Sequence, residues 1–500
     1  MLLGPAVKRH RLSYKRSVDP TNASSIIDQS CKVMIADMTA GVMDAVYRGV
    51  ALLCSSPGKL YCGSICSGSG MGELSVHYAI ARLCHVLPTR PRITPVIRFL
   101  CELDDEKADW CDSLNIGSPD ILIFRNAVDM CATKAYCRKA KGKKLVPPVD
   151  LLHAGVSCKD ISGLNDEAGQ NLGIILEWLK KLSIADGLAC ADEDMPSGTT
   201  AETLLATLQY VLKHKPSMVL MENVKAFLAL SNELMRLFKQ MGYAVRFVEV
   251  NSRDFGVPQS RPRVYMIACN RIALPMMPQI QSSEFGGYEK RWGDSVDTTL
   301  NALKAHRRNA IDDYLLPMDS PELLSVIDDM TVPTNPDENT LIWPARHDQL
   351  FKSIDCPGRP GLKQLHAFRA ALSHDTSRRM FDCVCRRQQE IILFFTLLWV
   401  KSGRLGEWAV DTSQNLWRLG KEPTPDQIPC LTGTSRIWLV RAQRLLIGEE
   451  CLAIQGINRH DVCSWKMPNM VLWSLAGNAF TGTVAAAVFY AGASAGPSLS

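Results

Sequence analysis

The sequence of 500 residues lacks several features that mark other classes of protein. Its longest strongly apolar run, residues 391–400, is too short to cross a bilayer, and no apolar stretch near the N-terminus is long enough for a signal peptide. No internal repeat or long low-complexity segment is present. We therefore expect an intracellular globular protein, with one large domain and a smaller one.

The 18 cysteines lack the spacing of a metal site. The closest pairs are Cys62 with Cys66 and Cys383 with Cys385, and neither has a second pair at zinc-finger distance. Inside a cell such cysteines are mostly buried, reduced thiols. The sequence thus predicts neither a metal ion nor a disulfide framework.

The charge is low in total but uneven in its distribution. The net charge is only +5, yet residues 8–16 form a basic head without acids, residues 134–144 form a second basic cluster, and residues 346–387 are rich in arginine. Any single cluster is usually a solvated surface. Three in one chain favour a polyanionic partner, and the head is typical of a nuclear-import signal or a loose nucleic-acid arm.

Short apolar runs alternate with longer amphipathic stretches between residues 60 and 270. This alternation predicts an α/β fold with a doubly wound, mostly parallel sheet, in which helices such as 200–214 separate the strands. From about 271 to 429 the periodicity is poor, and after that 444–457 and 472–491 are predicted to be helical. The expected strands are 60–67, 96–101, 121–124, 149–154, 218–221, 244–250 and 264–269.

Three polar segments follow expected strands, where parallel sheets present ligands. Glycines at 68, 70 and 72 follow the first strand and let the backbone approach a ligand closely, and Glu102 follows the second, where it can accept hydrogen bonds from ribose hydroxyls. Cys158 follows the fourth, on a loop that can keep a thiol accessible. The ordinary alternatives are a tight turn, a surface carboxylate and a buried small side chain.

Two further segments carry charged groups in the same order. Glu222 follows the fifth strand, although a carboxylate there can simply favour a helix start. The segment 251–265 contains Gln259, Arg261 and Arg263 at alternate positions, which puts them on one face if the run is extended. Two guanidiniums on one face suit a planar, partly anionic ligand, and the alternative is an exposed edge strand.

Taken together, these segments resemble the motifs of the cytosine-C5 DNA methyltransferases. The matching motifs are the glycine-rich turn, the Ser-Cys loop with Ser162 and Asn165, the run Glu222-Asn223-Val224, and the segment Gln259-Ser260-Arg261-Pro262-Arg263. Residues 444–457 and 476–482 resemble the family's C-terminal segments, so the likeness covers about 60–270 and 430–490. The chain departs from the family at Ser64 and Cys66, where an acid and an aromatic are usual, and at Ser157 and Lys159, where Pro-Cys-Gln is usual.

The resemblance implies a domain organisation and a set of site residues. Residues 1–59 would be a basic and helical extension, 60–270 an S-adenosylmethionine-binding catalytic domain, 271–429 a target-recognition domain, and 430–500 a return that completes the catalytic domain. The implied catalytic residues are Cys158 as nucleophile, Glu222 on the base edge, Arg261 reaching the base and Arg263 supporting Glu222. The implied residues for S-adenosyl-L-methionine are Cys66, Ser67, Gly68, Ser69, Gly70, Glu102, Leu103, Asp129 at the adenine amino group, Met130, Ser157, Asn478 and Ala479.

The implied function is methylation of cytosine C5 in double-stranded DNA, in the nucleus, through a covalent Cys158 adduct on a flipped-out base. The arginines at 378, 379, 386 and 387 are the expected grip on DNA. Without the proline the Cys158 loop would be looser, and Lys159 would favour the thiolate. Two alternatives stay open: an RNA cytosine methyltransferase, although the Cys-Phe-Thr and Pro-Pro-Cys motifs of the tRNA-methylating relatives are missing, and a catalytically silent binding module.

Overall fold

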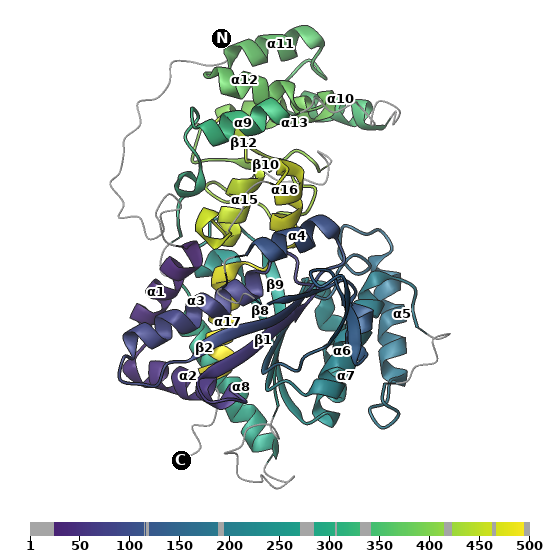
Figure 1. Cartoon of the computed structure of the whole chain (residues 1–500). Helices are drawn as coiled ribbons and strands as arrows, with labels where there is room; N and C mark the ends of the chain where they lie inside the picture. Colours follow the sequence, from purple (N-terminus) through teal and green to yellow (C-terminus); the bar gives the residue numbers. More distant parts are fainter. Residues whose placement is uncertain are drawn as a thin grey trace.

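The computed structural model describes residues 25–114, 116, 120–188, 195–270, 285–305, 308–330, 342–414, 423–462 and 467–494. The basic head at residues 8–16 lies outside the described residues. Figure 1 shows a lobe built around a large sheet, here called the sheet lobe, and a helical lobe formed by α9–α13. Short strands and the helices α15 (Gly448–Gln455) and α16 (Asn469–Asn478) lie between them.

The sheet lobe contains a nine-stranded mixed sheet in the order β5-β4-β3-β2-β1-β6-β7-β9-β8. The five central strands are parallel to one another: β3, β2, β1, β6 and β7. The strands outside them, β4 and β5 on one side and β9 and β8 on the other, pair antiparallel. This confirms the predicted doubly wound α/β class. The strands are β1 (Lys59–Ile65), β2 (Thr94–Cys101), β3 (Leu122–Phe124), β4 (Lys134–Cys137), β5 (Gly142–Leu145), β6 (Leu151–Ala154), β7 (Met218–Asn223), β8 (Tyr243–Asn251) and β9 (Pro262–Asn270).

All seven strands expected from the sequence are present, within three residues at either end. Two strands of this sheet were not expected: β4 and β5 form a hairpin from the second basic cluster. Its lysines lie on exposed positions of an edge, so the hairpin has no run of apolar residues that would indicate a strand. The expected helix at 444–457 begins instead as the strand β12 (Arg444–Leu445).

Helices cover both faces of the sheet (Figure 1). One apolar cluster joins the sheet to α1 (Ile26–Asp37), α2 (Ala40–Leu53), α3 (Met71–Val86), α8 (Phe285–Ala302) and α17 (Gly482–Ser494). The other joins the opposite face to α5 (Ala168–Lys181), α6 (Thr199–His214) and α7 (Ser231–Gln240). The fourth helix, α4 (Asp105–Ser113), follows β2.

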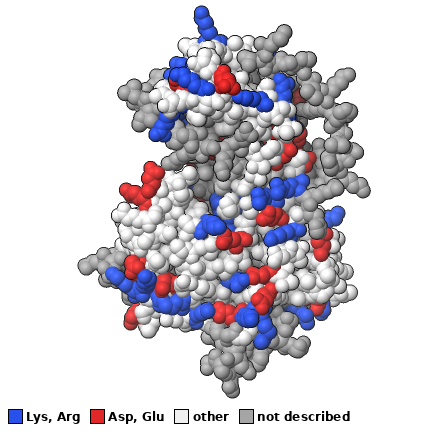
Figure 2. Space-filling model, turned by 180° about the vertical axis from the view of Figure 1, so that it is seen from behind, with Lys and Arg blue, Asp and Glu red and all other residues white. Residues whose placement is uncertain are grey.

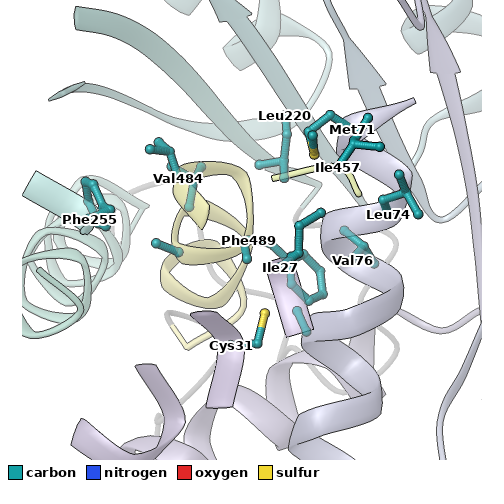
Figure 3. Packing of buried hydrophobic residues seen from close by; sticks show 14 of the residues in the cluster. Ile27, Cys31, Met71, Leu74, Val76, Leu220, Phe255, Ile457, Val484 and Phe489 are labelled. Atoms are coloured by element: carbon teal, nitrogen blue, oxygen red, sulfur yellow. The ribbon is translucent and has the colours of Figure 1, made fainter. Parts of the chain in front are cut away.

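The C-terminal helix α17 lies inside the first cluster, as Figure 3 shows for its neighbours from α1, α3 and β7. The segment Asn469–Ser494 is long and apolar enough to cross a membrane, but 78% of its most apolar 18-residue stretch is buried inside the protein. It also consists of two helices, α16 and α17, separated at residues 479–481. Protein packing therefore accounts for its apolar character.

The segment expected to be a separate domain, 271–429, is divided between the two lobes. Helix α8 and residues Ile311 and Tyr314 pack into the core of the sheet lobe, so the change of core lies beyond Tyr314 rather than at 271. The rest packs around its own cluster, together with the strands β10 (Ala409–Asp411) and β11 (Ile437–Leu439). Its helices are α9 (Pro321–Asp329), α10 (Ile342–Ser353), α11 (Leu362–Ala371), α12 (Asp375–Asp382) and α13 (Arg386–Lys401).

Candidate active site

The sheet brings most of the candidate residues to one edge. From β1 the chain moves outward to β2 and β3, then returns to the other side of β1 as β6 and β7. The carboxyl ends of these parallel strands share an edge, and ligands bind at such a switch point. Because β9 is antiparallel to β7, its beginning lies at the same edge. Six segments therefore converge at this edge: the turns or loops after β1, β2, β3 and β6, the end of β7 and the start of β9.

The turn after β1 has the backbone geometry of a close approach. Cys66, Gly68 and Gly70 have φ values of 56°, 55° and 68°, in the left-handed region. That conformation is easy for glycine and strained for Cys66. The N–H of Gly68 donates to Oε2 of Glu102 over 2.9 Å, which ties the turn to the end of β2. Burial raises the pKa of the Cys66 thiol to about 12, so this thiol is neutral.

The chemistry of this edge fits a nucleoside ligand. Oε1 of Glu102 receives the N–H of Asp104 at 3.1 Å, and each carboxylate oxygen keeps a second lone pair for a hydroxyl group. Leu103 is 63% exposed and Val128 is 45% exposed, so apolar surface is available beside β2 and β3. The hydroxyl of Ser69 is buried without a hydrogen-bond partner among the described residues. Val128 was missed by the sequence motifs because a lone valine carries no signal.

The other expected cofactor residues are placed as follows. Asp129 is exposed on the short 3-10 helix η1 (Ala127–Cys131), whereas Met130 is fully buried and lies in the apolar core. Ser67 accepts the N–H of Cys101 at 2.9 Å and so holds the turn to β2. Asn478 is exposed at the end of α16, and a Cβ on Gly68 would lie 3.6 Å from its carbonyl oxygen. The C-terminal return therefore reaches the glycine-rich turn, with Ala479 buried behind it.

Cys158 lies on the loop after β6, half-buried. Burial raises the pKa of its thiol above the ordinary value, and the carboxylate of Glu222 raises it further. The guanidiniums of Arg263 and Arg261 act in the opposite direction. The structure thus places Cys158 within electrostatic reach of the three other expected catalytic residues.

Two expectations about this loop differ from the structure. Lys159 is exposed, and the pKa of Cys158 is raised rather than lowered because burial outweighs the nearby cations. The loop is also held without proline: the N–H of Ser157 donates to Oγ1 of Thr203 at 3.1 Å, and its hydroxyl lies 2.8 Å from that of Thr199. On the other side, Nδ2 of Asn223 donates to the carbonyl of Val156 over 2.9 Å.

Glu222 and Arg263 form a mostly buried ion pair, with Nε 2.9 Å from Oε1. Arg263 thus contacts Glu222, and its part in catalysis stays a prediction. Oε1 is buried and accepts no hydrogen bond from the described residues, so its interaction with Arg263 is one of charge.

Arg261 does not lie where the sequence interpretation put it. Its side chain is buried and turned toward the C-terminal return, where it donates to the carbonyls of Leu431 at 2.7 Å, Gly477 at 3.0 Å and Ala479 at 2.7 Å. Alternation along an extended segment predicts on which face of the strand a side chain lies. It does not predict which loops from elsewhere in the chain pack against that side chain. The arginine expected to reach the base thus holds together the segments behind it. Gln259 is fully buried as well and accepts from Gln455 at 3.1 Å.

Cys430 was not expected at this site. Its sulfur lies 3.6 Å from Nη1 of Arg261 and 3.6 Å from Nη2 of Arg263. Despite its burial, the two guanidiniums lower the pKa of this thiol. It follows β9 by 160 residues and belongs to no motif, so only the tertiary structure brings it here.

The arginines expected to grip DNA are mostly engaged within the helical lobe. Arg379 pairs with Asp328, Arg386 lies 3.2 Å from the buried Glu390, and Arg387 donates to the carbonyl of Gln414. In the second basic cluster, Arg138 and Lys139 pair with acids of α4. On the face shown in Figure 2, basic and acidic side chains are intermixed over the sheet lobe.

Comparison with known proteins finds similarity to DNA methyltransferases. A family model for C-5 cytosine-specific DNA methylases matches residues 191–319, which include Glu222 and Arg263. The DNA (cytosine-5-)-methyltransferase DMT5 of Cryptococcus neoformans is 23% identical over 446 residues, 85% of this chain and 16% of the relative. The type II methyltransferase M2.ScrFI of Lactococcus lactis is 26% identical over 185 residues, 33% of this chain and 44% of the relative. Among solved structures, the Dnmt2 methyltransferase of S. pombe matches with a TM-score of 0.40 and 13% identity, covering 86% of this chain and 97% of that one.

The sheet just described has the mostly parallel, doubly wound α/β fold of the methyltransferase class. Part of the chain matches the C-5 cytosine-specific DNA methylase family, and the chain is similar to several cytosine-5 methyltransferases. It spans about a sixth of the length of the Cryptococcus relative and less than half of the Lactococcus one.

Proposed function

We propose that this chain is a DNA (cytosine-5)-methyltransferase that uses S-adenosyl-L-methionine and acts on double-stranded DNA. The observation that supports this most directly is the tie between the Cys158 loop and β7: Asn223 bonds to Val156, which brings the loop to the edge of the sheet where Glu222 pairs with Arg263. A nucleophile, a carboxylate and a cation at one place are what addition to a pyrimidine ring needs.

Cys158 first loses its proton to solvent, and its thiolate then adds to C6 of cytosine, which breaks the C5–C6 double bond and makes C5 electron-rich. Glu222 shares a proton with ring N3 and so stabilises this adduct, while Arg263 holds the carboxylate in place. S-adenosyl-L-methionine, when bound, would supply the methyl group that C5 accepts and would leave as S-adenosyl-L-homocysteine. A base then removes the C5 proton, the bond between C6 and sulfur breaks, and the thiolate is regenerated.

The residues that fit the cofactor are those of the first three strand ends. Glu102 would accept from the ribose hydroxyls, Leu103 and Val128 would flank the adenine, and the turn at Gly68 and Gly70 would receive the methionine portion, with Asn478 closing the side. Asp129 is exposed beside Val128, in agreement with the adenine contact proposed for it. Met130 belongs to the core beneath.

A stacked base is out of reach of this thiol, so the target cytosine must be flipped out, at a cost of a few kcal/mol. With Arg379, Arg386 and Arg387 engaged internally, we assign the DNA grip to other cations. The first candidates are the exposed lysines of the β4–β5 hairpin, which form no ion pair with any described residue: Lys134, Lys141, Lys143 and Lys144. The nuclear location stays a prediction of the basic head.

The test is covalent trapping on DNA that contains 5-fluorocytosine, because fluorine at C5 cannot leave as the proton does. Wild-type protein with S-adenosyl-L-methionine should form an adduct that survives denaturing electrophoresis, and Cys158→Ala should not. Trapping only on RNA with the same base would favour RNA methylation. Binding of S-adenosyl-L-methionine without any adduct would contradict catalysis and favour a silent binding module.

A further inference from the structure

Helix α6 begins next to the Cys158 loop and does not cap itself. Its N-cap residue is Gly198, which has no side chain to receive the first N–H groups. Asp160 from the loop supplies the cap: Oδ2 accepts the N–H of Thr200 at 2.7 Å, and Oγ1 of Thr200 accepts the N–H of Asp160 at 3.3 Å. The space is tight, since a Cβ on Gly198 would lie 2.6 Å from that carboxylate oxygen. The loop and the helix start thus satisfy each other.

The same turn of α6 holds the loop on the other side of the thiol. The hydroxyl of Thr203 donates to the carbonyl of Thr199 at 2.7 Å, which commits its proton to the helix and leaves its oxygen to accept. It accepts the N–H of Ser157 at 3.1 Å. The hydroxyl of Ser157 also shares a hydrogen bond with that of Thr199 at 2.8 Å.

Cys158 is therefore held on both sides. The backbone N–H groups of Ser157, before it, and Asp160, after it, both donate to threonine hydroxyls in the first turn of α6. Fixing the backbone on both sides limits the directions in which a Cα–Cβ bond can point. One residue further back, Val156 is tied to β7, the strand that carries Glu222. The loop is thereby set relative to the carboxylate as well as to the helix.

We propose that Thr199, Thr200 and Thr203 of α6, acting through Ser157 and Asp160, are positioning residues that set the attack geometry of the Cys158 thiol. This inference rests on the proposed function and deepens it. A displacement of about 1 Å at a reacting atom can cost about a hundredfold in rate, so a hydrogen bond that holds a nucleophile acts on the chemical step rather than on substrate binding.

The most informative substitution is Thr203→Val, which removes the acceptor for Ser157 and keeps the shape of the side chain. The matched control is Thr207→Val, one turn further along. The Thr207 hydroxyl makes the same kind of helical bond, to the carbonyl of Thr203 at 2.8 Å, and among the described residues it bonds to no loop atom. Thr203→Ser keeps the acceptor and should restore the wild-type behaviour.

Three measurements on the whole chain separate positioning from stability. We expect Thr203→Val to slow the single-turnover rate of adduct formation on 5-fluorocytosine DNA about tenfold at saturating DNA and cofactor. The affinity for S-adenosyl-L-methionine and the melting temperature should stay at the Thr207→Val level. The rate of iodoacetamide alkylation of Cys158, followed by mass spectrometry of its peptide, should also change in Thr203→Val and not in Thr207→Val.

The alkylation readout does not require methyl transfer. If the wild type forms no adduct, the proposed function fails. The positioning of Cys158 by α6 is then still tested by the alkylation rates. If Thr203→Val and Thr207→Val have the same rates of adduct formation and of alkylation, the positioning proposal is overturned while the proposed catalysis stands.

A double-variant cycle provides a second test that tolerates a loss of stability. Ser157→Ala and Thr199→Val each remove one half of the same hydroxyl pair, so the double variant should be no slower than the slower single variant. Losses that multiply would mean that the two hydroxyls act separately and would contradict the proposal.

Discussion

The Nε atom of Arg263 lies 2.9 Å from Oε1 of Glu222, and the two side chains are only 15% and 12% exposed. Both groups act on the pKa of Cys158, with opposite signs. This makes the carboxylate and the guanidinium separable by experiment, because their removal should change the reactivity of the thiol in opposite directions.

Replacing the carboxylate should make Cys158 more reactive and at the same time abolish methylation. In Glu222→Gln the negative charge that raises the pKa of the thiol is gone, so iodoacetamide alkylation at pH 7.5 should become faster. The N3 proton then has no carboxylate, and adduct formation on 5-fluorocytosine DNA should fall by two or more orders of magnitude, roughly the contribution of a general acid–base group. Arg263→Leu should slow alkylation instead. Equal alkylation rates in all three proteins would show that the charges do not reach the thiol.

Arg261 should behave as a structural residue. Arg261→Met leaves the carbonyls of Leu431, Gly477 and Ala479 without their donor in a buried place, and each unsatisfied carbonyl should cost about 1–3 kcal/mol of stability. We expect a lower melting temperature and weaker binding of S-adenosyl-L-methionine, because Ala479 follows the residue that meets Gly68. A variant of normal stability that fails only in base binding would restore the role first expected for this arginine.

The glycine-rich turn should not tolerate a side chain at residue 70. Gly70 has a φ of 68°, and a Cβ there would lie 2.2 Å from Cδ1 of Leu114. Gly70→Ala should therefore destabilise the protein and weaken cofactor binding, as isothermal calorimetry and thermal unfolding can show. The control is Gly41→Ala in α2, where no atom lies within 4 Å and alanine should be neutral or stabilising by about 0.5–1 kcal/mol.

Glu407 gives a prediction for pH dependence. Burial raises the pKa of this carboxyl group from 4.5 to about 7, against the N–H groups of Arg441 and Ala442 that lower it. A carboxyl group with a raised folded-state pKa stabilises the protein fully below its unfolded-state value and loses that contribution as pH rises through its folded-state value. The free energy of unfolding should thus fall by up to about 3 kcal/mol between pH 4.5 and 7 through this group. Glu407→Gln should remove this part of the slope, and an unchanged slope would count against it.

Sequence patterns located the strands because burial leaves a periodic trace. Continuous apolar runs such as 264–269 belong to strands buried on both faces, and their order along the chain fixed the doubly wound class. Local motifs also gave the ends of the strands, and hence the neighbourhood of Gly68, Glu102, Cys158 and Glu222. These features are local in sequence, so the sequence alone determined them.

The direction of each side chain was decided by contacts between distant segments. Arg261 turns toward residues 431–479 because three carbonyls there need a donor, and no local rule contains that information. Cys430 meets two arginines from 167 to 169 residues earlier. Helix α6 takes its cap from Asp160 because its own N-cap is a glycine. Hydrogen-bond satisfaction in a closed core acts across the whole chain, so it is settled only when the chain has folded.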